Sequence, residues 1–329
     1  MDHLASAKPA KPATAASTAP RVPRIIAHRG ASTEAPEHTY AAYVAALAAD
    51  ADGLECDVRL TADGHLVCVH DRKVDRVSNG TGVVSSLELA KLEELDFGGW
   101  HEATDARDAA SAASAAASAG DDGDDGDDEE PDRDDQNGQG GSPDANRVLT
   151  LRRLLDLVAA QTRRVELAIE VKHPSRYAGQ VERSLISVLD EYGWAPRGSH
   201  EPAGRTEHAE HAGQAEHTSP VRIMSFSSSA VRRAKRLAPG VGTVFLMEPF
   251  VYRARGGALP TGTRIAGPSI EILRTRPEAV ERWHRAGCEV HVWTVDEPAD
   301  FELCLSLGVD AVITNRPRAM RAALSALAG

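Results

Sequence analysis

Long apolar runs are missing from this chain of 329 residues. No stretch approaches the roughly 18–20 consecutive apolar residues that a membrane-spanning helix needs, so we expect no integral membrane segment. The first 22 residues are rich in alanine, proline and lysine, but they lack the apolar centre that a secretory signal peptide requires. We therefore predict a disordered leader over residues 1–22 and a cytoplasmic protein.

Cysteine is scarce, with four residues in the whole chain. These four, Cys56, Cys68, Cys288 and Cys304, each lie inside an apolar run, and their spacing matches no metal-binding pattern. This arrangement is typical of buried, reduced thiols in a cytoplasmic protein. It argues against a secreted domain held together by disulfides.

An excess of basic residues is also absent, since 49 Asp and Glu outnumber 37 Lys and Arg and the formal net charge is −12. The acidity is local, because residues 105–146 contain 14 Asp and Glu but only two arginines, and the rest of the chain is close to neutral. No basic stripe is present that could follow a polynucleotide backbone. We therefore expect no nucleic acid partner, and nothing in the pattern indicates an oligomeric state.

Two internal segments lack the apolar residues that a core needs. Residues 102–146 combine Ala/Ser repeats with runs of Asp and Gly, and residues 197–219 are polar and rich in histidine. Few hydrophobic residues and dense like charge are typical of disorder. We predict disordered inserts at both places, within a single domain that covers residues 23–329.

The remaining sequence alternates between strand-like and helix-like patterns. The strand-like runs cover residues 24–28, 53–59, 66–70, 164–172, 221–226, 242–248, 264–268, 289–295 and 311–314. The helical patterns cover residues 39–50, 85–95, 149–160, 177–193, 228–237, 277–286, 297–307 and 317–328. This alternation indicates a parallel sheet covered by helices, and the number of units predicts an α/β fold of the (β/α)8 TIM barrel type.

Nine strand-like runs are one too many for an eight-stranded barrel. The short, turn-like segment 61–64 suggests that the runs 53–59 and 66–70 form a hairpin. Such a hairpin would place Glu55 opposite His70 on one face, about 5 Å apart at Cβ. A parallel arrangement with an extended crossover is the alternative.

Carboxylates gather where these strands should end. Glu55 and Asp57 are two residues apart within a strand, so both side chains point to the same face, while the apolar residues between them point to the helices. Buried carboxylates without a counter-ion would be costly. Together with Glu170 from a distant strand they would form an all-oxygen ligand set, which selects a hard cation such as Mg²⁺ or Ca²⁺.

Histidine, arginine and lysine residues also occur near the predicted ends of these strands. His28 and His70 each end a strand-like run, and because imidazole titrates near neutrality they are candidates for general acid and general base. Which of them is the acid is not indicated. Arg29 offers a planar fork for two phosphate oxygens. Lys172 shares a face with Glu170, where it could pair with the carboxylates, face a phosphate, or do both.

These residues resemble the pattern of the glycerophosphodiester phosphodiesterase family. The motifs occur in the family's order over residues 24–318, as HRG at 28–30, PEHT at 36–39, ECD at 55–57, HD at 70–71, EVK at 170–172, SF at 225–226, VWTV at 292–295 and GVDAVITNRP at 308–317. His38 stands where the family usually has Asn. That position either caps the following helix or contacts the substrate.

The resemblance implies a metal-dependent hydrolase on a TIM barrel. It would cleave small glycerophosphodiesters into sn-glycerol 3-phosphate and an alcohol, with acid–base work at His28 and His70. The resemblance also implies substrate contacts for Glu37 and Trp293. The ordinary alternatives are a carboxylate favoured in the first turn of a helix for Glu37, and a core residue of the barrel for Trp293.

Two other functions stay open. A lysophospholipase D-like activity on single-chain lipids would be favoured by an apolar rim around the barrel mouth, and the two inserts are polar. A non-catalytic interaction protein would use the acidic insert as its functional part. The intact set of acid–base and carboxylate residues argues against the second alternative, since a protein without activity has no need of it.

The acidic insert gives the first testable prediction. Replacing residues 105–146 with a short Gly/Ser linker should leave the fold and the kcat/KM on a glycerophosphodiester nearly unchanged, because loop length alters closure entropy only weakly. The isoelectric point should rise toward neutrality. A tenfold fall in kcat/KM, or loss of the cooperative unfolding transition, would show that the insert packs on the barrel.

Overall fold

The computed structural model describes residues 22–99, residues 146–195 apart from 174, 176 and 178, and residues 219–328. The predicted leader and the predicted inserts at 102–146 and 197–219 lie outside these ranges, except for one residue at an edge of each. The two ends of the first gap meet, because the backbone N–H of Phe97 donates to the carbonyl of Asn146 at 2.7 Å. The chain therefore leaves the fold and returns to it at nearly the same point.

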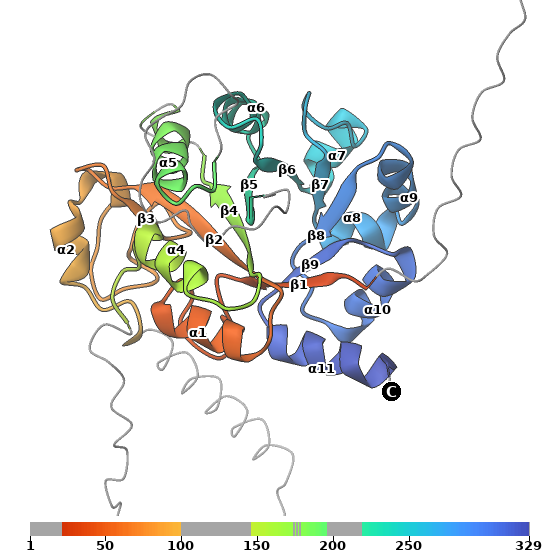
Figure 1. Ribbon diagram of the computed structural model, residues 1–329, viewed down its shortest axis with the longest axis horizontal. Helices are drawn as coiled ribbons and strands as arrows, with labels where there is room; N and C mark the ends of the chain where they lie inside the picture. Colours follow the sequence, from red (N-terminus) through yellow and green to blue (C-terminus); the bar gives the residue numbers. More distant parts are fainter. Residues whose placement is uncertain are drawn as a thin grey trace, which may run out of the picture.

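Eight parallel strands close into a barrel, which confirms the predicted TIM fold (Figure 1). In order around the barrel they are β1 (Arg24–His28), β2 (Gly53–Leu60), β4 (Glu166–Val171), β5 (Val221–Ser225), β6 (Gly242–Met247), β7 (Ile265–Pro268), β8 (Glu289–Val292) and β9 (Ala311–Thr314). Pairing of β9 with β1 closes the ring. The C-terminal ends of all eight strands define the mouth of the barrel, where active sites of this fold lie.

The surplus strand is β3 (Leu66–Cys68), which forms the predicted hairpin with β2. The predicted register is wrong by one residue, because Val58 pairs with Cys68. Glu55 and His70 are therefore not directly opposite, and the strand ends at Cys68 instead of continuing to residue 70. The Val69 N–H still donates to the Asp57 carbonyl of β2 at 3.0 Å. His70 lies in the loop that follows and lines the pocket at the mouth.

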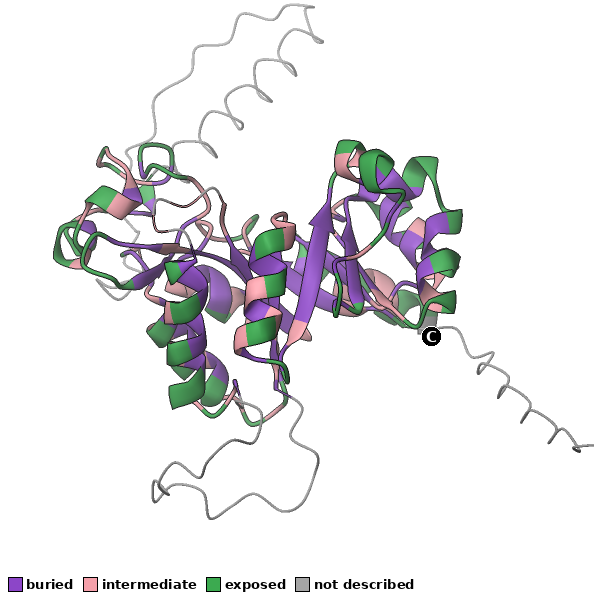
Figure 2. Ribbon diagram, turned by 90° about the horizontal axis from the view of Figure 1, so that it is seen from above, coloured by how far each residue is buried: buried purple, intermediate pink, exposed green. Residues whose placement is uncertain are grey.

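Helices cover the outside of the barrel, with their buried sides on the strands and their exposed sides toward solvent (Figure 2). They are α1 (Tyr40–Ala48), α4 (Leu151–Ala159), α5 (Gln180–Glu191), α6 (Ser228–Leu237), α7 (Pro249–Arg255), α8 (Ile270–Thr275), α9 (Glu278–Arg285), α10 (Pro298–Leu307) and α11 (Pro317–Ala328). The short helix α2 (Leu89–Glu93) lies apart from the barrel, where Leu92 packs in a separate apolar cluster with Val74 and Phe97 (Figure 1). Among the described residues, no helix has the length and apolar character needed to cross a membrane.

The helix predictions differ from the structure in three places. The pattern at 85–95 is split into a 3-10 turn at Val84–Ser86 and the short helix α2, separated by an extended residue at Leu87. The short helices α7 and α8 were not predicted at all. Both have only six or seven residues, which is too short for a clear helical period in the sequence.

Alternation along the strands separates the core into two layers. Leu54, Cys56 and Val58 of β2 pack between the barrel and the helices, so the residues between them face the barrel interior. The middle of the interior holds an apolar cluster that includes Ile26 and Met224. Of the four cysteines, all free, three are buried as predicted, whereas Cys288 is only partly buried.

An ion network fills the interior at the N-terminal ends of the strands. Arg24 of β1 donates to Glu166 of β4 at 2.8 Å and to Glu289 of β8 at 2.6 Å. His291 Nε2 lies 3.0 Å from the same guanidinium. Together with the apolar cluster above it, this network closes the barrel at that end, so the site must lie at the mouth.

Candidate active site

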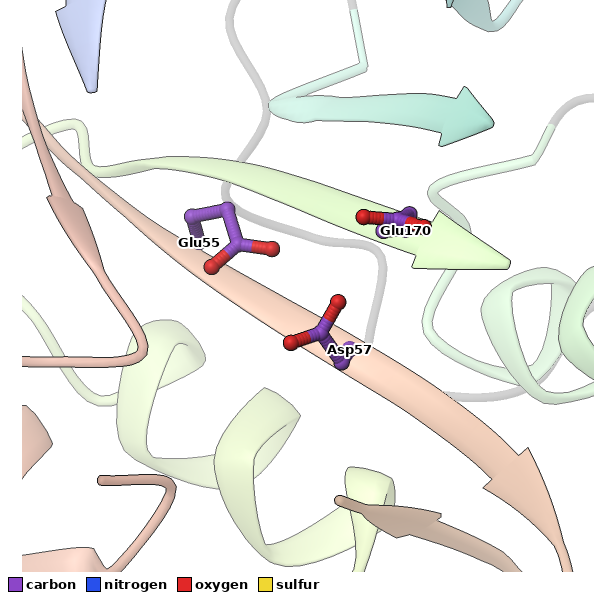
Figure 3. Close-up of side chains that lie close together, drawn as sticks. All are labelled: Glu55, Asp57 and Glu170. Atoms are coloured by element: carbon purple, nitrogen blue, oxygen red, sulfur yellow. The ribbon is translucent and has the colours of Figure 1, made fainter. Parts of the chain in front are cut away.

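Strand register brings three carboxylates together at the mouth (Figure 3). Asp57 of β2 is the register partner of Glu170 on β4, and Glu55 lies one interior position below Asp57. All three are buried, and ligand oxygens of Glu55, Asp57 and Glu170 lie within 4.8 Å of one another. The structure therefore brings together the three residues that the sequence predicted as metal ligands.

The three carboxylates do not carry the same proton affinity. Burial raises the pKa of Glu170 to about 8, and the neighbouring charge of Asp57 adds to the rise. Burial and the Asp57 charge also raise the pKa of Glu55 well above its usual range. Burial opposes ionisation of Asp57 too, but a hydrogen bond from His38 and the charges of Lys172 and Arg29 outweigh it and hold the Asp57 pKa well below its usual range. The cluster has more carboxylate than its cations neutralise.

Two cations face this cluster. Lys172 Nζ lies 3.2 Å from Asp57 Oδ1 and 3.0 Å from Glu170 Oε1, so the predicted pairing with both carboxylates is present. Arg29 donates its backbone N–H to Glu55 at 3.0 Å, and its Nε lies 3.4 Å from Asp57. That Nε makes no hydrogen bond within the described residues although it is buried. The guanidinium thus keeps donor capacity for a further anion.

The loop after β1 holds Arg29 in place through an unusual backbone. Arg29 and Gly30 both have positive φ angles, of 60° and 87°. At Gly30 a Cβ atom would come within 2.8 Å of Ala42, on the first helix. The close approach explains why the HRG motif needs glycine here, because the turn that aims Arg29 at the carboxylates leaves no room for a side chain.

His28 is held in one orientation by a chain of hydrogen bonds. Asn315, at the end of β9, donates its side-chain N–H to Asp296 at 2.6 Å, which leaves its oxygen facing His28 Nδ1 at 2.7 Å. The Nδ1–H of His28 therefore donates to Asn315, and Nε2 has no partner within the described part of the chain. Burial, and then the charge of Arg29, lower the pKa of His28 to about 4. The ring is neutral at pH 7 with a free Nε2 lone pair.

His70 is held from the other side of the pocket. Its Nδ1–H donates to Asp71 at 2.7 Å, and Arg76 Nε donates to the second oxygen of Asp71 at 2.7 Å. Arg76 also donates to Glu37 at 2.8 and 2.9 Å, and Arg29 donates to Glu37 at 3.1 Å. Glu37 thus lies between Arg76 and Arg29. It connects the hydrogen-bonded chain of His70, Asp71 and Arg76 to Arg29. The alternative reading of Glu37 as a carboxylate in the first turn of a helix is wrong.

His38 contacts a carboxylate of the cluster and does not cap the helix. Thr39 is the N-cap of α1, because its side chain accepts from the Ala42 N–H. His38 is buried, its Nε2–H donates to Asp57 Oδ2 at 2.9 Å, and its Nδ1 lies 2.8 Å from the Tyr43 hydroxyl. Tyr43 in turn donates to the backbone carbonyl of Glu55 at 3.1 Å. A buried chain therefore joins two of the three clustered carboxylate residues through α1.

Trp293 and Phe226 form an apolar wall opposite the charged residues. Their rings pack edge to face at 5.2 Å, and Trp293 Nε1 donates to the Gly267 carbonyl at 2.8 Å. They line a pocket of about 110 Å³ that His28, Arg29, Glu55, His70, Glu170 and Lys172 also line. One side of this pocket is charged and the other apolar, so it suits a ligand with a phosphate and a small carbon skeleton.

Several supporting residues were not found from the sequence. Arg76 belongs to a loop after His70 and carries no motif, and Asp296 reaches His28 only through Asn315. Asp71 is indicated by the sequence only as the second residue of the HD motif. Arg76 and Asp296 act through side-chain contacts between separate loops, which residue spacing along the chain does not reveal.

Comparisons with known proteins agree with this geometry. A family model, the Glycerophosphoryl diester phosphodiesterase family, matches residues 28–319. A protein of Mycobacterium tuberculosis with the name "Probable glycerophosphodiester phosphodiesterase 1" is 38% identical over 293 residues, which cover 89% of each chain. A glycerophosphodiester phosphodiesterase of Bacillus subtilis is 29% identical over 296 residues, covering 89% of this chain and 83% of its own.

Solved structures share the fold. A phosphodiesterase of Oleispira antarctica in complex with the product sn-glycerol-3-phosphate superposes with a TM-score of 0.65 at 21% identity, covering 92% of this chain and 97% of its own. A glycerophosphodiester phosphodiesterase of Agrobacterium tumefaciens gives a TM-score of 0.61 at 23% identity, covering 92% of this chain and all of its own. At these identities the similarity shows the TIM barrel alone.

Fold and sequence matches together define a phosphoric diester hydrolase on a TIM barrel. The chain belongs to the glycerophosphoryl diester phosphodiesterase family, because the family model covers most of its length and a relative is 38% identical over 89% of it. This confirms the resemblance found in the sequence, and with it the hydrolysis of glycerophosphodiesters as the activity of the class.

His38 gives a prediction about stability. Its φ angle is 60°, a left-handed conformation that Asn tolerates better than Ala. An Asn side chain would also keep a donor near Asp57, whereas Ala would leave a buried carboxylate oxygen without one. We expect His38→Ala to lower the free energy of unfolding in urea by about 2–3 kcal/mol, and His38→Asn to lower it by about 1 kcal/mol or less. Equal losses for the two variants would contradict this role.

Proposed function

We propose that this protein is a divalent-metal-dependent glycerophosphodiester phosphodiesterase that uses His28 and His70 as acid–base catalysts. The observation that carries the proposal is the shared pocket. Glu55 and Glu170 of the carboxylate cluster line it together with two imidazoles and two cations, opposite an apolar wall. The substrate would be a small diester of glycerol phosphate, and the products would be sn-glycerol 3-phosphate and an alcohol.

The residues present fit a hard divalent cation. Glu55, Asp57 and Glu170 offer only oxygen ligands, and these lie close enough together to share one ion. Burial, and then the charge of Asp57, raise the pKa values of Glu55 and Glu170, so both carboxylates would gain from a bound cation. A cation held there would supply charge neutralisation at the phosphoryl oxygens, and Mg²⁺ and Ca²⁺ both suit such ligands.

The protein's own residues divide the remaining work. Arg29 would bind the phosphoryl oxygens with its unused donors, and Lys172 would place a second positive charge beside them. Neutral His28 is suited to take a proton from the nucleophile, either water or the 2-hydroxyl of the glycerol. His70 would give a proton to the leaving alcohol oxygen. Burial lowers the pKa of His70, and the hydrogen bond to Asp71 opposes that shift by favouring the protonated ring.

The two alternative functions receive less support. Large hydrophobic residues that are exposed within the described ranges are Val22, Val44, Phe250 and Leu327. Only Phe250 follows the mouth end of a barrel strand, and one side chain does not form the apolar rim that a single-chain lipid would need. Membership of an enzyme family argues against a purely non-catalytic interaction protein.

Metal binding and acid–base roles can be separated experimentally. We expect Mg²⁺ or Ca²⁺ to bind the wild type in isothermal titration calorimetry, and a strong chelator to abolish turnover reversibly. Asp57→Asn should lose most of the metal affinity. His28→Ala and His70→Ala should bind metal like the wild type while kcat falls about 100-fold or more. Full turnover after exhaustive chelation would exclude a metal from the mechanism. A wild-type kcat in His70→Ala would exclude His70 as a general acid or base.

Trp293 gives a prediction about substrate binding. As a wall of the pocket it should contribute equally to ground-state and transition-state binding, so Trp293→Ala should raise KM for glycerophosphocholine more than it lowers kcat. The matched control is Trp283→Phe, a conservative change at a buried tryptophan of α9 that lies outside the pocket lining. Unchanged KM in Trp293→Ala would show that the residue is core filler only.

A further inference from the structure

A second cavity shares Lys172 as a lining residue with the catalytic pocket. It has a volume of about 370 Å³ and is lined by Arg59, Arg72, Lys172, Ser85, Ser175 and Tyr177, with three aliphatic residues. Lys172 also lines the catalytic pocket, so one side chain forms a wall of both spaces. Anything bound against Lys172 in the catalytic pocket therefore lies next to this second cavity.

The charged side chains that line the cavity are all positive. Three of its lining residues are cations and none is a carboxylate. Lys172 is paired with Asp57 and Glu170, which belong to the catalytic side. Arg59 and Arg72 form no ion pair with any described residue. Like charges that share a cavity repel each other, so an arrangement of this kind favours an anion as the missing partner.

Arg59 is partly buried and directed by the barrel. It follows Glu55 and Asp57 on the interior face of β2, one step nearer the mouth. Its Nε and Nη2 donate to the backbone carbonyl of His70 at 3.0 and 2.7 Å. Those bonds fix the plane of the guanidinium and leave its Nη1 edge without a hydrogen-bond partner among the described residues. Arg59 thus connects the cavity to the residue proposed to protonate the leaving alcohol.

Arg72 and three hydroxyl groups complete the lining. Arg72 lies in the loop after His70, and its backbone carbonyl, not its side chain, accepts the Val84 N–H that ties this loop to the 3-10 turn. Ser85 and Ser175 add side-chain hydroxyls that can donate to an anion, whereas the Tyr177 hydroxyl already donates its one hydrogen to the Ser85 carbonyl at 2.8 Å. Arginine and hydroxyl groups are the usual donors for phosphate and carboxylate oxygens.

We propose that this cavity is a subsite for an anionic group on the alcohol part of the substrate. The inference rests on the proposed function, because it places the glycerol side at Trp293 and the alcohol side across Lys172. The enzyme would then prefer glycerophosphodiesters whose alcohol carries a phosphate or a carboxylate. A quaternary ammonium head group, such as that of glycerophosphocholine, would meet Arg59 and Arg72 with like charge.

A matched pair of substrates tests the proposal. Glycerophosphoglycerol has an uncharged alcohol, and the same diester with a phosphate on its terminal hydroxyl differs only by that anion. We expect kcat/KM of the wild type to be at least about fivefold higher for the phosphorylated diester, the size of a partly exposed charge-assisted interaction. A third diester, with glycerate as the alcohol, separates a subsite for carboxylate from one for phosphate.

Variants of Arg72 assign the preference to this cavity. Arg72→Gln should reduce the ratio of kcat/KM between the charged and uncharged substrates toward one, and Arg72→Lys should retain most of it. Arg236→Gln is the matched control, because it removes the same charge from an exposed position on α6 and should leave the ratio at its wild-type value. Melting temperatures of the three variants would show that each is folded.

The outcomes distinguish this inference from the proposed function. If the wild type cleaves both substrates with equal kcat/KM, or if Arg72→Gln leaves the ratio unchanged, the subsite is refuted while the phosphodiesterase activity stands. If the wild type cleaves neither diester, the proposed function fails. In that case calorimetry measures the Kd of each uncleaved diester for the wild type and for Arg72→Gln. The anion subsite predicts tighter binding of the phosphorylated diester by the wild type, and a smaller difference between the two diesters in Arg72→Gln.

Discussion

Crowding of three carboxylates at one end of a barrel is the constraint on which the rest of the site depends. Glu55, Asp57 and Glu170 are buried within 4.8 Å of one another, where their charges would repel strongly. The neighbouring groups are arranged to relieve this repulsion, with Arg29 and Lys172 as counter-ions and His38 as a hydrogen-bond donor. Three carboxylates that face two cations leave one negative charge unpaired when all three are ionised.

His28 and His70 are oriented by separate sets of hydrogen bonds on the two sides of this cluster. His28 depends on Asn315, the residue after β9, and on Asp296, which lies in the loop after β8. His70 depends on Asp71, which Arg76 ties to Glu37 and so to the first loop. Different supports give the two rings different surroundings, one enclosed and one beside a carboxylate. Such a difference is what separates a general base from a general acid.

Alternation and strand order made much of this predictable from the sequence. Two carboxylates at i and i+2 between apolar residues had to face the barrel interior, and parallel strands had to bring Glu170 to the same end. The hairpin of β2 and β3 was predicted, but its register was wrong by one residue. The turn sequence after Leu60 does not determine which residues of the two strands are paired. The contacts of His38 and Arg76 depend on the path of irregular loops, including a positive φ at His38, and no periodic pattern encodes that path.

The ion network around Arg24 restricts where the substrate can enter the barrel and where the products can leave it. Arg24, Glu166 and Glu289 close the barrel at the end away from the site, and the apolar interior above them leaves no passage. Substrate must therefore enter by the mouth, and both fragments must depart by the same opening. In the proposed arrangement, with the glycerol part against Trp293 and Phe226, the two fragments share this one exit.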